Sequence, residues 1–193
     1  MSNSNADIDR YLNGLADVMN KLDRSRINSA IDALMKAYET GGRIFIFGNG
    51  GSGATASHIV CDFNKGVSIN LKKKFEFVCL NDNIPTMLAI ANDLEYGDVF
   101  VFQLKDRLRK DDVVIAISGS GNSENVVRAV KYAKECGNSV ITLTGYDGGK
   151  IMKLADHPVH ANIKDMQKAE DTHMIILHLM CQIIAAKLGQ KMC

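Results

Sequence analysis

The sequence predicts a single α/β domain in three layers, with a parallel sheet covered by helices on both faces. Apolar runs rich in β-branched and aromatic residues alternate with segments of helical periodicity from residue 43 onward. The chain has 193 residues, of which 46% are hydrophobic, so it can bury one sizeable core. No linker rich in proline or glycine divides it, and residues 1–193 are therefore expected to form one domain.

Two helices are expected before the first strand. Apolar residues recur at helical spacing from Ile8 to Leu22 and again from Ile27 to Tyr38. Gly41-Gly42 then ends the second run. The first helix is amphipathic enough to need a packing partner.

Five strands and six further helices follow in alternation. The strands are expected at residues 43–47, 75–80, 113–117, 139–144 and 158–160. The helices are expected at residues 52–64, 84–92, 99–108, 123–136, 150–155 and 166–188. In parallel sheets of this kind ligands bind at the carboxyl ends of the strands, so the loops at those ends are the place to look for function.

Two of the strands end in loops of glycine and serine that open a helix. The first loop is Gly48-Asn49-Gly50-Gly51-Ser52-Gly53, and the second is Ser118-Gly119-Ser120-Gly121-Asn122-Ser123. Glycine lets the backbone approach a ligand closely, serine supplies hydroxyl donors, and the first amides of a helix attract anions. Neither loop is a Walker loop, because no Gly-Lys-Ser/Thr follows. Both therefore indicate an oxyanion site other than a nucleotide site, with a plain connecting turn as the alternative.

Composition argues against several other classes. The net charge is +1 and both signs are spread along the chain, which gives no reason to expect a nucleic-acid or membrane partner. The five cysteines are scattered without a Cys-x-x-Cys pair and indicate free thiols in a reducing compartment: Cys61, Cys79, Cys136, Cys181 and Cys193. The start lacks the charged and apolar regions of a signal peptide, so a cytoplasmic protein is expected.

Titratable residues gather on two of the predicted helices. His58 and Asp62 are four residues apart after the first loop and so share one helix face. The last helix carries Glu170, His173 and His178. The structural alternatives are a surface hydrogen bond for the first pair and a core position for His178. An enzyme acting on a phosphosugar, however, needs a base, an acid and an anion clamp in one pocket, and these residues could supply all three.

The same side chains also suit zinc, which prefers nitrogen and oxygen ligands. Glu170 and His178 are eight residues apart, or about 12 Å of rise on a continuous helix. One ion cannot take both from one straight helix of one chain. Either the helix begins after Glu170, or one of the two belongs to the site of a neighbouring chain.

With these residues in view, the chain resembles the sugar isomerase (SIS) domain family, and within it the members that isomerise sedoheptulose 7-phosphate, the phosphoheptose isomerases. The resemblance covers nearly the whole sequence and includes both loops. Its further motifs are His58 with Asp62, Ala91-Asn92-Asp93, Val140 to Gly145 with Asp147-Gly148-Gly149, and Glu170-Asp171-x-His173-x4-His178.

The resemblance implies a flavodoxin-like fold with a five-stranded parallel sheet and two leading helices at residues 7–40 that serve in oligomerisation. It also implies a homotetramer with active sites between subunits, so that the catalytic carboxylate and imidazole come from adjoining chains. The reaction implied is an aldose-ketose isomerisation through an enediol, with Asp62 moving a proton between carbons and His178 moving the proton on the oxygens.

The resemblance further assigns the rest of the site. The residues implied to bind the substrate lie mainly in the two loops: Asn49, Gly50, Gly51, Ser52, Asn92, Asp93, Ser118, Gly119, Ser120, Ser123 and Glu170. One zinc ion per site is implied, held by His58, Asp62, Glu170 and His178.

Departures from the family pattern leave alternatives open. Asp62 stands where the heptose isomerases have a glutamate, and a displacement of about 1 Å can cost on the order of a hundredfold in rate. Glu170 replaces a glutamine, Gly119 a threonine and Gln167 an aspartate, while Gly66 stands at the position of a substrate-binding arginine. A six-carbon phosphoketose is therefore a second substrate to consider. A non-catalytic SIS protein, which senses a phosphosugar or docks on a partner protein, is the alternative of a different class.

Overall fold

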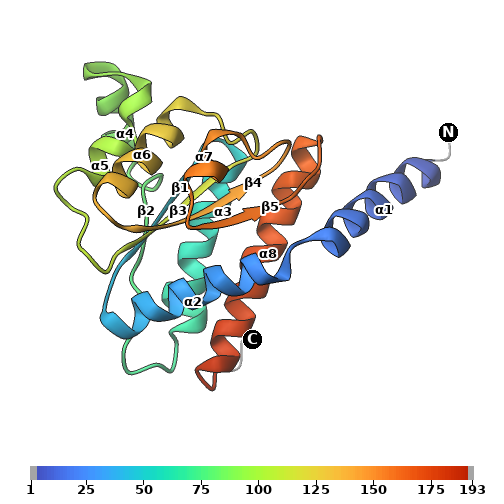
Figure 1. The fold of residues 1–193 in the computed structure, drawn as a ribbon, viewed down its shortest axis with the longest axis horizontal. Helices are drawn as coiled ribbons and strands as arrows, with labels where there is room; N and C mark the ends of the chain where they lie inside the picture. The colour runs from blue at the N-terminus through green and yellow to red at the C-terminus, as the bar shows by residue number, and fades with distance from the viewer. Residues whose placement is uncertain (1–3, 191–193) are drawn as a thin grey trace.

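The computed structural model describes residues 4–190 and contains a five-stranded, all-parallel sheet in the order β2-β1-β3-β4-β5 (Figure 1). Its strands are β1 (Ile44–Gly48), β2 (Phe77–Cys79), β3 (Val113–Ser118), β4 (Ser139–Thr144) and β5 (His157–His160). This order is that of a flavodoxin-like doubly wound sheet. The predicted α/β class, the parallel sheet and its five strands are confirmed.

Helices account for most of the remaining described chain. The α-helices are α1 (Asn5–Lys21), α2 (Arg24–Thr40), α3 (Gly51–Cys61), α4 (Ile84–Asp93), α5 (Val101–Leu104), α6 (Glu124–Glu135), α7 (Gly149–Leu154) and α8 (Met166–Lys187). A π-helix, η1 (Asp62–Val67), continues α3, and a 3₁₀ turn, η2 (Tyr96–Asp98), follows α4.

The sheet is covered on both faces because its central strands are apolar on both sides. Alternate residues such as Ile44, Ile46 and Ile115 pack with α2, α3 and α8 in one core. The residues between them, such as Phe45 and Val114, pack with α4, α5, α6 and α7 in the other. The three layers expected from continuous apolar strands are therefore present.

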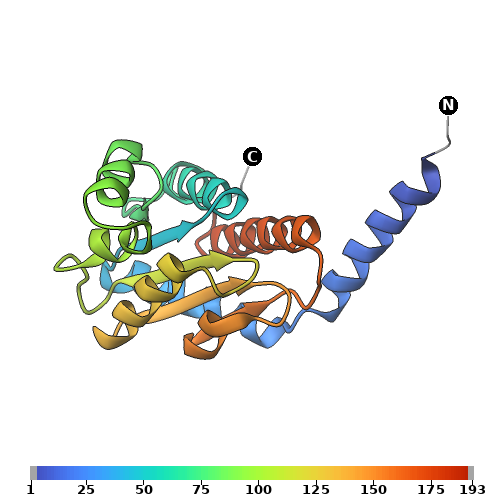
Figure 2. The ribbon, with the colours of Figure 1, turned by 90° about the horizontal axis from the view of Figure 1, so that it is seen from above.

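The first two helices are set by local signals. The Asp23 carboxylate accepts hydrogen bonds from the first amides of α2, and Gly41 ends that helix in the left-handed region. In contrast to α2, helix α1 projects away from the rest of the molecule (Figure 2) and buries only Val18 among its described side chains. Ile8 and Leu12 on α1 are 52% and 56% exposed. The amphipathic face of α1 is thus without a cover in a single chain.

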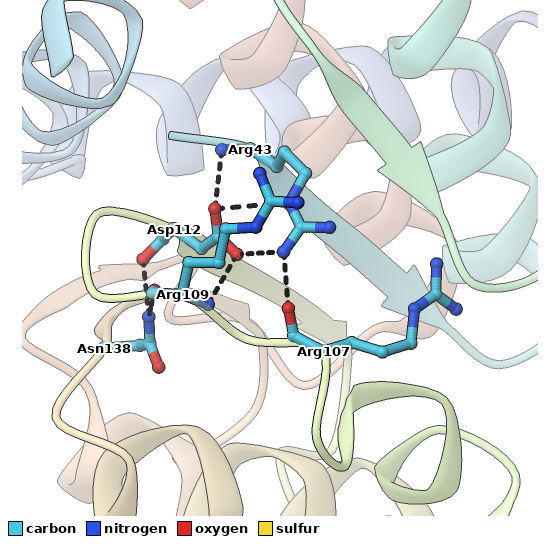
Figure 3. Close-up of polar contacts among 5 residues, drawn as sticks. All are labelled: Arg43, Arg107, Arg109, Asp112 and Asn138. Atoms are coloured by element: carbon cyan, nitrogen blue, oxygen red, sulfur yellow. Dashed lines mark hydrogen bonds and ion pairs between the residues drawn. The ribbon is translucent and has the colours of Figure 1, made fainter. Parts of the chain in front are cut away.

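The amino ends of β1 and β3 are joined by a buried polar network (Figure 3). The Asp112 carboxylate, on a residue that is 2% exposed, accepts from the Arg43 backbone and guanidinium at 2.8 and 2.7 Å and from the Arg109 amide at 2.8 Å. The Asn138 amide donates to the Arg109 and Asp112 carbonyls, at 2.6 and 3.0 Å. Every oxygen of this buried carboxylate is paired, so the network stabilises the sheet edge opposite the glycine loops.

Some predicted boundaries were wrong. The helix expected at 99–108 is α-helical only over 101–104, because the chain is extended at Lys105 and Asp106 has a φ of 58°. The strand expected at 75–80 pairs only over 77–79, and the Asn64 side chain bonds both backbone polar groups of Phe77 at the outer edge. The helix expected at 52–64 begins one residue earlier and changes to a π-helix at Asp62.

Four of the five cysteines lie within the described residues, and all four are free thiols: Cys61, Cys79, Cys136 and Cys181. Cys193 lies outside the described residues. Burial raises the pKa of the Cys79 thiol to about 12 and also raises that of Cys181, so these two thiols are unreactive. Within residues 4–190, every helix is too short or too polar to span a lipid bilayer.

Candidate active site

The two glycine loops lie side by side at the carboxyl edge of the sheet. Their strands are direct neighbours, with Gly48 of β1 in register with Ile117 of β3. Across the gap the side-chain amides of Asn49 and Asn125 donate to each other, at 2.9 Å in both directions. The loops therefore form one surface made of two helix N-termini, those of α3 and α6, where backbone amides favour an anion.

The Asn81 side chain also holds the backbone of the first loop in place. Gly50 adopts a φ of 54°, which lets the chain turn sharply from β1 into α3. The Asn81 amide bonds both the Gly48 carbonyl, at 2.8 Å, and the Gly48 amide, at 3.3 Å. Ser52 is 5% exposed in the first turn of α3. The predicted binding residues of this loop are thus held in a defined backbone conformation.

The second loop carries three serine hydroxyls. Ser118 Oγ accepts from the Gly121 amide at 3.1 Å, and Ser120 Oγ accepts from the Asn122 amide at 3.2 Å. Ser123 occupies the N-cap of α6, but its side chain makes no capping hydrogen bond. Because hydroxyls can donate while they accept, all three remain able to donate to an anion.

A cluster of two imidazoles and a carboxylate lies on the neighbouring helices. His58 comes from α3, Asp62 from the first position of η1 and His178 from α8. His58 Nε2 and His178 Nε2 are 2.9 Å apart, and Asp62 Oδ2 lies 3.3 Å from the first and 3.2 Å from the second. Their side chains are between 24% and 48% exposed, so the cluster is open to a ligand.

This cluster has the composition and spacing of a metal site. Its ligand atoms all lie within 4.8 Å of one another. Two ligands of a tetrahedral zinc ion, each about 2.0 Å from the metal, are about 3.3 Å apart, and the three separations here are close to that value. Two nitrogens and one oxygen, with a further position open to solvent, are a donor set typical of catalytic rather than structural zinc.

The sequence-based picture of this cluster needs two corrections. Asp62 and His178 meet within one chain, so the expectation that they come from adjoining chains was wrong for this pair. Helix α8 runs unbroken from Met166, so it does not begin after Glu170, and Glu170 lies outside the cluster. One chain therefore brings together only three of the four predicted metal ligands, because Glu170 and His178 are eight residues apart on one continuous helix.

Glu170 lies instead against the first loop. A Cβ placed on Gly51 would come 2.6 Å from Glu170 Oε2, so this carboxylate lies directly beside the start of α3. The positive end of the α3 dipole stabilises a carboxylate at that place. Glu170 therefore faces the predicted substrate rather than the predicted metal.

The structure places Asn92 and Asp93 at the exposed end of α4, where the Asn92 amide donates to the Asp93 carboxylate at 2.8 Å. Three residues farther on, the Tyr96 hydroxyl donates to Asn49 Oδ1 at 3.1 Å. The segment after α4 is therefore joined to the first loop through Tyr96, while neither Asn92 nor Asp93 is hydrogen-bonded to either loop.

A cavity among the described residues lies elsewhere. It has a volume of about 750 Å³ and lies at the amino edge of the sheet, between α2 and the starts of β3, β4 and β5. Its histidine, His157, has both ring nitrogens bonded, to Ser29 Oγ at 2.6 Å and Ser139 Oγ at 3.1 Å. Its lining mixes lysines with aspartates, so it lacks the anion-binding character of the loops at the opposite edge.

His173 is the one histidine of α8 that does not face the site. It is 1% exposed, and neither ring nitrogen meets the geometry of a hydrogen bond among the described residues. Burial lowers the pKa of His173 to about 4, with His160 adding to the shift and the Thr144 backbone opposing it. His173 is therefore neutral at physiological pH and is part of the core.

This burial predicts a loss of stability in acid. Above pH 6.5 the His173 imidazole is unprotonated in both the folded and the unfolded chain. Between pH 6.5 and about pH 4 it is protonated in the unfolded chain only. The free energy of unfolding therefore falls as the pH is lowered through this range. The pKa difference corresponds to about 3 kcal/mol by pH 4. We expect His173→Phe, which keeps the ring and removes the titration, to reduce this loss in urea unfolding at pH 8 and pH 4. A variant as acid-sensitive as the wild type would contradict this.

Comparison with known proteins agrees with this geometry. The SIS domain family matches residues 10–145. The phosphoheptose isomerase of Clostridium acetobutylicum is 34% identical over 167 residues, which are 86% of this chain and 85% of that protein. The chain belongs to the SIS domain family, among the phosphoheptose isomerases.

Solved structures of this family have the same fold. The phosphoheptose isomerase of Francisella tularensis superposes with a TM-score of 0.87 at 25% identity, covering 94% of this chain and 96% of that one. That of Neisseria gonorrhoeae superposes with a TM-score of 0.84 at 30% identity, with the same coverage. The predicted fold and family are confirmed.

Three residues that shape the site were not predicted from the sequence: Asn81, Tyr96 and Asn125. Of these three, Asn125 is the one that the sequence could have indicated. It is a polar residue in the first turn of an amphipathic helix, at a position that the helical pattern turns toward the core. A buried amide there needs hydrogen-bond partners, and the other loop supplies them.

Proposed function

We propose that this protein is an aldose-ketose isomerase of a phosphorylated sugar, with sedoheptulose 7-phosphate as the substrate and a heptose 7-phosphate as the product. The observation that carries the proposal is the pairing of an anion-binding double loop with an acid and an imidazole on the helix that one loop opens. From Ser52 to His58 is six helical residues, about 9 Å along the axis. That separation suits an extended sugar phosphate, with the phosphate in the loops and the carbonyl end at the cluster.

The reaction follows from the two titratable groups. The Asp62 carboxylate takes a proton from C1 of the ketose, and the electrons of that bond form the enediol as the carbonyl oxygen on C2 gains a proton from His178. Asp62 then returns its proton to C2 while His178 removes the proton from the oxygen on C1, which becomes the aldehyde. The 3.2 Å separation of Asp62 and His178 lets both act on adjacent atoms of one substrate.

The serine hydroxyls and helix amides bind the phosphate: Ser52, Ser118, Ser120 and Ser123, with the backbone of Gly50, Gly51 and Gly119. Asn49, Asn92, Asp93 and Glu170 bind the sugar hydroxyls. Holding the phosphate at a fixed distance from Asp62 orients the chain of carbons, and this positioning is a large part of the rate enhancement available to such a site.

In this proposal zinc is held by His58, Asp62 and His178. Bound zinc would polarise the substrate oxygens as a Lewis acid.

We expect protein purified from zinc-containing medium to retain the metal, and His58→Gln to lose most of it, because the substitution removes one of three ligands in the chain. Metal analysis checks this, with His160→Gln as the matched control away from the cluster. Equal metal content in the two variants would contradict the assignment.

The active form in this proposal is a homotetramer in which α1 and α2 contribute to the contacts between chains. Exposed apolar residues on α1, Ile8 and Leu12, support it, as do Ile175 and Leu179, which flank His178 on α8 and are 37% and 40% exposed. Light scattering on the purified protein tests the mass of the assembly. A monomer at micromolar concentration would contradict the tetramer.

The test of substrate is turnover on a panel of phosphoketoses. Sedoheptulose 7-phosphate is expected to be converted with a higher kcat/KM than six-carbon phosphoketoses. Binding without conversion of any phosphoketose would instead favour a sensor or adaptor of the SIS family.

A further inference from the structure

We propose that Asn125 and Tyr96 are positioning residues that fix the Asn49 amide with one N–H as its free hydrogen-bonding group, so that this position selects an oxygen acceptor on the sugar. This inference rests on the proposed function only for the identity of the ligand. The orientation of the amide depends on its hydrogen bonds alone.

The first step is the hydrogen-bond capacity of Asn49. Its Oδ1 accepts from Asn125 Nδ2 at 2.9 Å and from the Tyr96 hydroxyl at 3.1 Å, which uses both lone pairs. Its Nδ2 donates to Asn125 Oδ1 at 2.9 Å, which uses one of two hydrogens. What remains is a single N–H donor on a half-buried side chain. A sugar hydroxyl or carbonyl must therefore accept, not donate, at this place.

The second step is the rigidity of the partner. Asn125 is 2% exposed, and its Oδ1 also accepts from the Val126 amide at 2.9 Å. Its oxygen is thus saturated by Asn49 and Val126, and turning this amide over would set two donors against each other in a buried place. Asn125 cannot follow a reorientation of Asn49 and so holds it.

The third step is the placement of Tyr96. Arg128, one turn after Asn125 on α6, pairs with Asp98 at 3.0 Å and with Glu95, the residues on either side of the Tyr96-Gly97 step. A Cβ on Gly97 would lie 2.7 Å from Arg128 Nη1, so glycine admits the guanidinium there. Helix α6 thereby positions the second loop, the Asn49 amide and the Tyr96 hydroxyl together.

The experiment compares Tyr96→Phe and Asn125→Ala with the wild type, using sedoheptulose 7-phosphate and inorganic phosphate as separate probes. We expect Tyr96→Phe to raise KM for the sugar phosphate about three- to tenfold, the effect of one hydrogen bond, and Asn125→Ala to raise it more. Affinity for inorganic phosphate should stay within twofold in Tyr96→Phe. Tyr38→Phe is the matched control, since it removes a hydroxyl bonded at 2.9 Å to the Lys73 carbonyl, away from the loops.

Two outcomes would overturn the proposal: no change in KM with Tyr96→Phe, or an equal loss of affinity for phosphate and sugar phosphate. A second measurement does not depend on the substrate. In ¹⁵N spectra the two Asn49 side-chain proton signals should differ in solvent exchange, with the proton bonded to Asn125 Oδ1 exchanging slowly, and this protection should be lost in Asn125→Ala. If these signals behave as expected while sedoheptulose 7-phosphate is not bound by the wild type, the proposed function fails and the amide orientation stands. If both protons exchange rapidly with solvent in the wild type, the orientation fails.

Discussion

Asp62→Asn is expected to lower kcat for sedoheptulose 7-phosphate about a thousandfold. A positioned general base contributes roughly 10²- to 10⁴-fold, and the amide that replaces it cannot take a proton from carbon. The amide is nearly the same size as the carboxylate, so the loops and their hydrogen bonds stay in place. Steady-state kinetics with a coupled assay for the aldose product measures the effect.

Two comparisons make this test specific. Affinity for inorganic phosphate, measured as competitive inhibition, should be unchanged in Asp62→Asn, because the proposed phosphate site lies in the loops and not at the cluster. Asp111→Asn makes the same change on an exposed residue at the opposite edge of the sheet and should leave kcat as it is. If Asp62→Asn costs less than threefold in kcat, Asp62 is not the base.

Gly121→Ala is expected to destabilise the fold by about 2–4 kcal/mol. Gly121 has a φ of 64°, and a Cβ there would lie 2.1 Å from the Gly148 carbonyl oxygen. The left-handed conformation costs an alanine about 1 kcal/mol or more, and the backbone contact adds an overpacking cost of about 1–3 kcal/mol. Since the Gly121 carbonyl also accepts from the first amides of α7, at 2.9 and 3.1 Å, the second loop should move with it.

Gly137→Ala is the matched control for this substitution. Gly137 has a φ of 78°, but a Cβ there would meet no atom within 4 Å. Its cost should be the conformational part alone, about 1 kcal/mol. Urea unfolding of both variants separates the two contributions. Equal destabilisation would mean that the close approach of Gly148 to the second loop has no energetic weight.

The sheet, its five strands and both loops could be predicted because their signals are local. A buried parallel strand is a continuous apolar run, and Val113 to Ile117 is one. The loop glycines and serines follow such runs directly, so their place at the carboxyl edge follows from the fold class alone. The four-residue spacing of His58 and Asp62 likewise predicts that they share a helix face, and they lie 3.3 Å apart.

What could not be predicted depends on contacts between distant segments. The convergence of His178 with Asp62 is set by the packing of α8 against α3 and η1, which no local pattern specifies. The π-helix at Asp62 is similar: π-turns are rare and often lie at functional sites, but no residue type marks them. The short α5 ends where the chain turns so that the Arg107 carbonyl can accept from Arg43, a contact across 64 residues.

The most direct test of the account is incubation of the protein with sedoheptulose 7-phosphate in D₂O, followed by NMR of the recovered sugars. We expect formation of a heptose 7-phosphate with deuterium incorporated at C2, and loss of both in Asp62→Asn. Recovery of unlabelled sedoheptulose 7-phosphate alone, under conditions where the protein binds it, would contradict the claim that Asp62 and His178 of one chain form an isomerase site.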